Sequence, residues 1–446
     1  MNRKIAEEIV LLISIFKWFV LATAVGAVIG ASTSLFLFLL DYATKSVDNY
    51  SYGFFLLPLA FFLSSLITKL APEARGHGTE KVIEAVHRRA GRIKPMVVPI
   101  KILTTVITLA AGGSAGKEGP CAQIGAGLSS TVSDWLHLTN VDRKKLVICG
   151  ISAGFASVFG TPIAGAIFGI EVLFVGAMMY DVLLPSFIAG VVSYQVSSSL
   201  GVQYFYHPIA FVPDFSELLF IKVFVSGILF GLCSLFLIEA MLLFKHISSK
   251  IKIWGPLKAA LAGVVLILLT FALSQDYLGL GLDTIEGALE GEKVVWWGFA
   301  AKVLFTSITL TFGGSGGIVT PIFFIGASVG SLVGTMMGVD PATFAAIGMV
   351  ALLSGAANTP IAASILAVEL FGSSIAPYAA TACVASFLMT GHRSVYPSQV
   401  FAIMKSGSFR KHIGKEVEEM EAEFKMRKGS LISTVLSYIK KRVKWL

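Results

Sequence analysis

Charged residues are scarce in this chain. Asp, Glu, Lys and Arg make up only 14% of its 446 residues, whereas 55% are hydrophobic, and the mean hydropathy is +0.80. A water-soluble globular protein needs far more polar surface than this composition supplies. The apolar residues form long uncharged runs without two-residue alternation, which is typical of membrane-spanning helices and not of barrel strands. We therefore predict an all-α integral membrane protein.

Cysteine is also rare. The four cysteines stand apart in apolar surroundings without CxxC spacing, at Cys121, Cys149, Cys233 and Cys383. We therefore expect neither a disulfide framework nor a metal site, and no cofactor. A cleavable leader is not expected either, because mixed charges begin the chain and no small-residue cleavage site follows Lys17.

The few charges are unevenly distributed. Lys and Arg gather in residues 73–94, 142–145 and 245–252 and after residue 392, whereas residues 276–292 hold five acidic residues and no basic one. The positive-inside rule then predicts a multi-pass protein of the cell membrane with both termini cytoplasmic. The net charge of +8 is a topology signal, and no basic residues interleave with aromatics as in nucleic-acid binders. We expect the lipid bilayer as a partner, and no nucleic acid.

Apolar segments recur along the chain, and several are too short to cross a bilayer alone. They fall near 17–42, 53–71, 96–112, 121–134, 146–159, 161–176, 180–200, 217–246, 256–275, 295–312, 321–338, 343–357, 359–373 and 374–390. Half-length segments interrupted by Gly and Pro predict broken helices whose irregular backbone lines a cavity or is buried in protein.

The chain contains an internal repeat. GGSAGKEGPCAQIGAGLSS at 112–130 aligns without gaps on GGSGGIVTPIFFIGASVGS at 313–331, and TPIAGAIFGIE at 161–171 aligns on TPIAASILAVE at 359–369. The nearly equal offsets predict two halves, about 17–200 and 217–400. In transporters, paired Gly/Pro-interrupted segments present helix N-termini to a ligand, which here favours an anion. The glycines alone would also fit close helix packing, but packing does not explain KE in one copy and IVT in the other.

Three motifs resemble those of the CLC family of chloride channels and chloride/proton antiporters. They are GKEGP at 116–120, GGIVTP at 316–321 and SVYPSQV at 394–400, and the resemblance covers about residues 17–405. It implies a CLC-type two-fold inverted repeat of broken and tilted helices, and a homodimer with one pore in each subunit. It also implies chloride as substrate, protons as partner, and no enzymatic activity.

The resemblance assigns the site residues. Glu118 corresponds to the family's gating glutamate, whose carboxylate competes with the anion and accepts a proton. Backbone N–H groups of Ile318 and Val319 and the hydroxyl of Tyr396 are the expected anion donors. The full set of predicted anion-binding residues is His77, Gly78, Gly116, Lys117, Gly119, Ile318, Val319 and Tyr396.

Two departures from the family pattern leave alternatives open. GSGxP of typical chloride members reads GHGTE, so His77 stands in place of serine and Glu80 in place of proline, which leaves the anion preference open. Val172 stands where many antiporters carry an internal proton-transfer glutamate. Chloride/proton exchange is our leading hypothesis, and a passive pH- or voltage-gated chloride channel is the alternative that Val172 favours. Glu171 and its repeat mate Glu369 are expected to cap or pair helix ends.

Three further features complete the predictions. Residues 1–405 form the transmembrane domain, and 406–446 form a cytoplasmic basic amphipathic tail, too short for regulatory CBS-type domains. Lys101 and Lys117 either add positive potential along the anion path or extend to the membrane interfaces. Ser152 in GISAG formally matches a nucleophile motif, but it lies in a Gly/Ala-rich segment, so an intramembrane hydrolase is a remote alternative.

Overall fold

The computed structural model describes residues 3–50, 52–209, 216–406 and 413–419, and this part of the chain is almost entirely helical. The first half contains α1 (Arg3–Asp48), α2 (Leu57–Ile67), α3 (Thr79–Arg88), α4 (Val97–Ala110), α5 (Glu118–Trp135), α6 (Asn140–Phe159), α7 (Pro162–Glu171) and α8 (Leu183–Ser199). The second half contains α9 (Glu217–Lys250), α10 (Gly255–Ala272), α11 (Leu282–Leu289), α12 (Gly298–Phe312), α13 (Val319–Met337), α14 (Pro341–Ala357), α15 (Pro360–Phe371) and α16 (Ala376–Met389). Two short strands, β1 (Phe174–Val175) and β2 (Val400–Phe401), pair in parallel.

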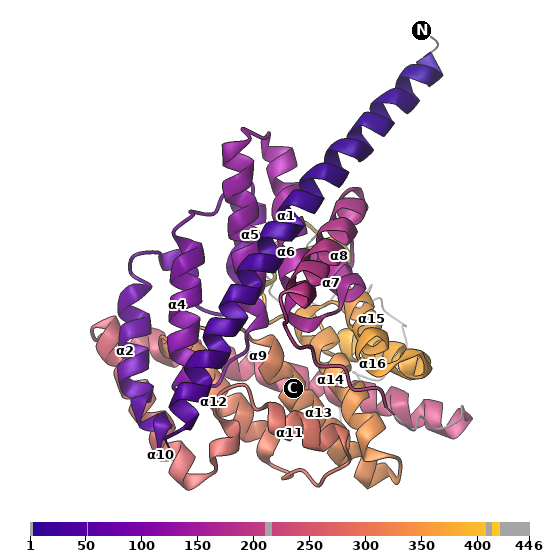
Figure 1. Cartoon of the computed structure of the whole chain (residues 1–446). Coiled ribbons are helices and arrows are strands. Elements are labelled where there is room, and N and C mark those ends of the chain that lie inside the picture. Colours follow the sequence, from indigo (N-terminus) through magenta and orange to yellow (C-terminus); the bar gives the residue numbers. More distant parts are fainter. Residues whose placement is uncertain (1–2, 51, 210–215, 407–412, 420–446) are drawn as a thin grey trace.

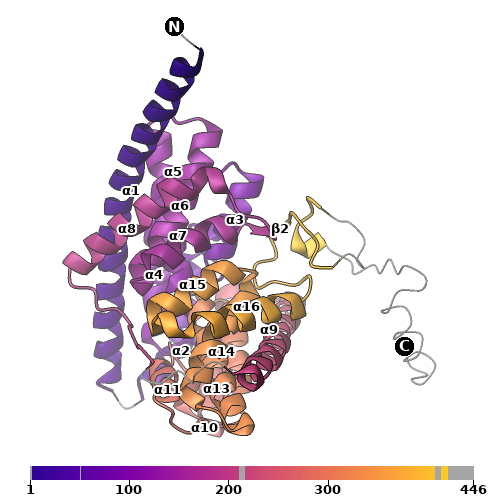
Figure 2. The same cartoon turned by 90° about the vertical axis from the view of Figure 1, so that its right-hand side faces the viewer.

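The protein combines helices of full and partial length, as the apolar segments predicted. Five helices are long and apolar enough to cross a membrane, and seven described apolar helices are shorter, at 10–17 residues. The longest is α1, with 46 residues. At about 1.5 Å per residue it exceeds the ~30 Å hydrocarbon core of a bilayer roughly twofold. Figures 1 and 2 show its N-terminal part extending beyond the other helices.

The repeat predicted from the sequence is present in the fold. Helices α5 and α13 begin at equivalent residues, and α7 and α15 each begin at the proline after an equivalent threonine. Within each half, the long repeat helix packs on the next one, α5 on α6 and α13 on α14. Glycines allow this: a Cβ on Gly125 would lie 2.2 Å from the Gly150 carbonyl oxygen, and one on Gly326 would lie 2.4 Å from that of Gly348. Close packing is therefore a second role of the repeat glycines.

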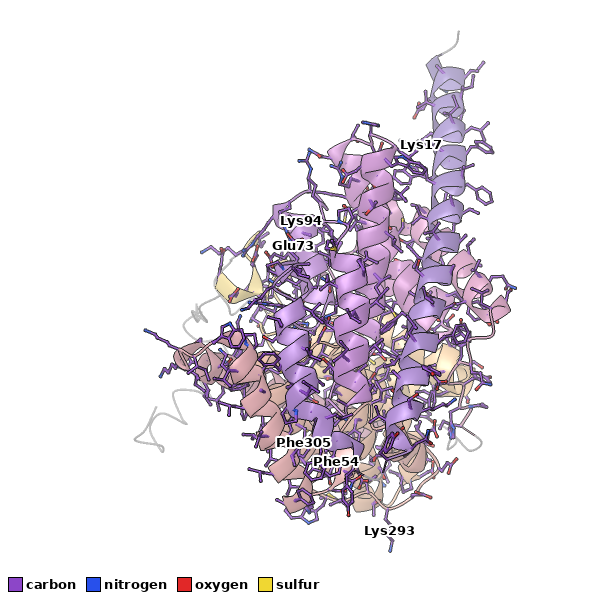
Figure 3. All side chains as sticks on the ribbon, turned by 60° about the vertical axis from the view of Figure 1, so that its left-hand side comes forward. Lys17, Phe54, Glu73, Lys94, Lys293 and Phe305 are labelled. Atoms are coloured by element: carbon purple, nitrogen blue, oxygen red, sulfur yellow. The ribbon has the colours of Figure 1, made fainter. Side chains whose placement is uncertain are left out.

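The basic segment 73–94 and the acidic segment 276–292 of the sequence lie towards opposite ends of the molecule. Figure 3 shows Lys94, in the basic segment, towards one end and Lys293, which follows the acidic segment, at the opposite end. The assignment of the basic end to the cytoplasm stays a prediction from the positive-inside rule.

Glu171 and Glu369 join the two halves by a reciprocal contact. The Glu171 carboxylate, at the end of α7, accepts hydrogen bonds from the backbone N–H groups of Ile361 (3.1 Å) and Ala362 (2.7 Å) in the first turn of α15. The Glu369 carboxylate accepts from Ile163 (3.0 Å) and Ala164 (2.7 Å) in the first turn of α7. Each acid satisfies free amides at a helix start and complements its dipole. The expected capping role of both residues is confirmed.

Figure 2 shows the consequence, with α7, α8, α15 and α16 gathered on one side of the molecule. The contact crosses from one repeat to the other and is made twice. It therefore stabilises the association of the halves at two symmetry-related points.

We predict that Glu171→Ala and Glu369→Ala each destabilise the detergent-solubilised protein. Each change removes two charge-assisted hydrogen bonds and leaves two helix-end amides without their partner, at a cost of about 2–4 kcal/mol. The measurement is the thermal unfolding midpoint followed by tryptophan fluorescence. Glu290→Ala, an exposed acid after α11, is the matched control. Equal midpoints for all three variants would contradict the capping role.

Candidate functional site

Two Gly-rich turns, one from each repeat, meet at the centre of the protein. The Gly116 N–H donates to the Gly317 carbonyl at 2.7 Å, and the Gly317 N–H donates to the Gly116 carbonyl at 2.5 Å. These equivalent residues form a single antiparallel bridge. The turns lead directly into α5 and α13, so two helix N-termini with their free amides and positive dipole ends face one region. Such a region attracts a negative charge.

Glu118 supplies that negative charge. It is the first residue of α5, and only 1% of its surface is exposed. Its carboxylate accepts hydrogen bonds from the backbone N–H (3.1 Å) and the hydroxyl (2.5 Å) of Thr320, in the first turn of α13. A buried carboxylate at membrane depth needs such donors to offset its lost hydration. The acid of one repeat therefore lies at the amide end of the other, where an anion would also bind.

Thr320 was missed by the sequence analysis. It aligns with Gly119 of the first repeat, so a hydroxyl replaces a hydrogen atom at this position. The predicted donors Ile318 and Val319 lie just before it and are buried. No hydrogen bond from their backbone N–H groups is found among the described residues. Both amides are thus free to bind a ligand at the start of α13.

Two glycines allow a third segment, the turn of His77 and Gly78, to approach the start of α5. Gly78 has a φ of +78°, and a Cβ on it would lie 2.4 Å from the Gly119 carbonyl oxygen. A Cβ on Gly119 would lie 2.1 Å from the His77 carbonyl oxygen. Only glycine fits at these two positions. The turn of His77 and Gly78 therefore lies directly against the start of α5, beside Glu118.

His77 and Tyr396 form a polar pair next to these helix ends. Their ring centroids are 5.6 Å apart. The His77 Nδ1 and the Tyr396 hydroxyl oxygen are both buried, and neither has a hydrogen-bond partner among the described residues. Burial, followed by the charge of Lys101, lowers the pKa of His77 to about 3, so the imidazole is neutral at pH 7. Two unpaired polar atoms beside the amide-rich region fit a small polar ligand.

Lys101 lies behind the site, fully buried. Its ammonium donates to the carbonyls of Gly76 (2.6 Å) and Ala74 (3.2 Å) and to the Ser315 hydroxyl (3.2 Å). It therefore joins the His77 turn to the Gly-rich turn of the second repeat and adds positive potential there. Extension of Lys101 to a membrane interface is thus wrong, because its ammonium points inward. Lys117, which precedes Glu118, is half-buried and has no ion pair among the described residues.

A cavity of about 560 Å³ opens beside the His77 turn. It is lined by Arg75, His77, Glu80, Lys81, Glu84, Arg88, Lys245, Lys258, Ser398 and Glu418, among others. Basic residues outnumber acidic ones in this lining. This cavity, which we call the vestibule, therefore reaches His77 and has an excess of positive charge in its lining.

Ser152 and Val172, also considered above, are both held in contacts between segments of the fold. The Ser152 hydroxyl donates to the Ala166 carbonyl at 3.2 Å, where α6 packs on α7, so its oxygen is held in a helix contact. Val172 is fully buried, and its carbonyl accepts from the Gln399 side chain at 2.8 Å. In the described part of the chain, no group of His, Cys, Asp and Glu could hold a metal ion.

Comparisons with known proteins agree with this arrangement. The family model described as voltage gated chloride channel matches residues 59–391. A "Chloride/fluoride channel protein" of Pseudomonas syringae pv. tomato is 36% identical over 400 residues, which is 88% of each chain. An "H(+)/Cl(-) exchange transporter ClcA" of Salmonella agona is 28% identical over 388 residues, covering 77% of this chain and 80% of the transporter.

Solved structures show the same fold. A CLC-type fluoride/proton antiporter superimposes with a TM-score of 0.83 at 25% identity, over 86% of this chain and 98% of its own. A slow cyanobacterial Cl-/H+ antiporter gives a TM-score of 0.72 at 20% identity, over 84% and 94%. The CLC-type repeat of broken helices expected from the motifs is confirmed. This chain therefore belongs to the CLC family, whose members are channels or transporters and not enzymes.

Proposed function

We propose that this protein exchanges a small halide for protons across the membrane, with Glu118 as the gate and proton acceptor. The observation that carries the proposal is the bond between the Glu118 carboxylate and Thr320 at the start of α13. The carboxylate and a halide would compete for the same amides and the same positive dipole end. Chloride is the substrate expected from the motifs, and the relatives named above add fluoride as a second candidate.

The proposed cycle follows from that competition. An ionised Glu118 binds at the start of α13 and closes the path. Protonation removes the negative charge, so the side chain releases Thr320 and the free amides of Ile318 and Val319 bind an anion. When Glu118 loses its proton to the other side, the carboxylate returns and displaces the anion. His77, Gly78, Gly116, Lys117, Gly119 and Tyr396 complete the proposed anion path.

The surrounding assignments are proposals of the same kind. We assign residues 1–405 to the transmembrane domain and 406–446 to a cytoplasmic tail, most of which lies outside the described residues. Both termini are assigned to the cytoplasm on the positive-inside rule, and the functional unit to a homodimer with one path in each subunit. A passive chloride channel stays the second candidate, because Val172 is a buried apolar residue where an acid would serve proton transfer.

The test of exchange is a liposome experiment with an imposed halide gradient and a pH-sensitive dye. We expect the wild-type protein to drive protons uphill against the halide gradient. Glu118→Gln should abolish proton movement, because the amide cannot accept and release a proton. Anion flux without proton movement in the wild-type protein would favour the channel instead.

Thr320→Val should weaken the closed state. The valine keeps the shape of the side chain but removes one hydrogen bond to a charged group, which contributes about 1.5–3 kcal/mol. We expect the ratio of halide flux at neutral pH to halide flux at acidic pH to rise several-fold above that of the wild-type protein. Thr335→Val, further along α13, is the control. An unchanged ratio would show that the Thr320 hydroxyl does not hold the gate.

His77→Ser tests the anion preference. Serine is the residue of typical chloride members at this position, so we expect chloride flux to rise relative to fluoride flux. A single donor contributes about 1 kcal/mol, which corresponds to roughly fivefold. The exposed His137 offers a matched control as His137→Ser. An unchanged chloride-to-fluoride ratio would remove His77 from the selectivity site.

A further inference from the structure

Glu80 links two segments of the candidate site. It is the second residue of α3 and lies three residues after His77. Its carboxylate accepts hydrogen bonds from Ser398, through the backbone N–H at 3.2 Å and the hydroxyl at 2.5 Å. Ser398 lies two residues after Tyr396. The carboxylate therefore joins the segment that carries His77 to the segment that carries Tyr396.

Glu80 is also open to the vestibule, where its surroundings differ from those of the other acids. Glu84 pairs with Lys81 at 2.7 Å, and Glu418 pairs with Lys245 at 3.4 Å. Glu80 has no ion-pair partner among the described residues, although it lines the same cavity. The other charged or titratable groups in that lining are Arg75 and His77 from the turn, Arg88 from α3 and Lys258 from α10. Of the vestibule acids, Glu80 is thus the one held by neutral donors.

The environment of Glu80 suits proton binding near neutrality. Burial raises its pKa to about 7, although the Ser398 hydrogen bonds and the charge of Lys81 act in the opposite direction. An acid with a pKa close to the working pH can both take up and release a proton. Tyr396 lies on the segment that Glu80 holds through Ser398, and its ring is next to that of His77. The His77 carbonyl in turn faces Gly119, the residue after Glu118, so the two acids are connected through this part of the candidate site.

We propose that Glu80 is the proton acceptor on the vestibule side, performing the step for which Val172 carries no acid. A proton from vestibule water converts the Glu80 carboxylate to the neutral acid. The same proton then leaves Glu80 and neutralises Glu118, whose side chain releases Thr320 as a result. Both acids return to their starting states over a full cycle, so no other reactant is needed. This inference rests on the proposed proton-coupled exchange.

Glu80→Gln tests the inference in the liposome assay. The amide oxygen of glutamine can still accept from Ser398, but the side chain cannot carry a proton. We expect halide flux to persist and proton movement to fall by about tenfold or more. Glu84→Gln makes the same charge change in the same vestibule and should leave both fluxes unchanged. Proton movement in Glu80→Gln equal to that of the wild-type protein would overturn the inference.

The outcomes separate this inference from the proposed function. If the wild-type protein moves no protons, the proposed exchange fails, and the role of Glu80 fails with it. If the wild-type protein and Glu80→Gln both move protons, only the role of Glu80 fails. If Glu80→Gln loses both fluxes, Glu80→Asp and Glu80→Asn decide the question. Proton movement restored by aspartate and not by asparagine would support a proton acceptor, and equal behaviour of the two would contradict it.

Discussion

Two positive helix ends held against each other are the constraint on which the structure depends. The bridge between Gly116 and Gly317 brings the starts of α5 and α13 together, and Lys101 adds a buried ammonium behind them. Like ends repel in a medium of low dielectric constant unless a negative charge lies between them. Glu118 provides that charge from within the chain. The same requirement is met when a halide takes its place, so the stability of the centre and the affinity for an anion have one physical origin.

The remainder of the site serves this arrangement. Gly78 and Gly119 let a third segment approach the helix starts to van der Waals distance. That segment brings His77, whose ring lies next to the ring of Tyr396. The His77 Nδ1 and the Tyr396 hydroxyl oxygen are both buried without a hydrogen-bond partner among the described residues. Glu80 then joins the same segment to the chain after Tyr396. Apart from Lys117, backbone amides and neutral groups thus supply the donors of the candidate path, while the other positive charges lie behind it or in the vestibule. Binding by partial charges leaves an anion able to depart again.

Much of the site could be predicted because the internal repeat places equivalent residues in both halves of the chain. The repeat placed Glu118 opposite the start of α13, and it paired Glu171 with Glu369. It could not identify Thr320, because the donor to Glu118 depends on which amide the side chain reaches and not on the motif. The amphipathic helix α3 was missed for a different reason: the predictions for residues 73–94 rested on their charge and on GHGTE, and not on helical periodicity. Lys101 was ambiguous, since a lysine next to an apolar run points inward or outward according to the carbonyls that surround it.

The reciprocal caps bear on how such a fold could arise. In the present chain, α7 caps α15 with Glu171, and α15 caps α7 with Glu369. Two identical copies of an ancestral half, related by a two-fold axis, could have made this contact with each other, residue for residue. The contact therefore requires no new capping residue after gene duplication and fusion. On this view the membrane protein is a fused dimer. The two originally equal halves then differ at the centre, where the first reads KEG and the second reads IVT. The second half keeps the free amides, and the first half carries the acid.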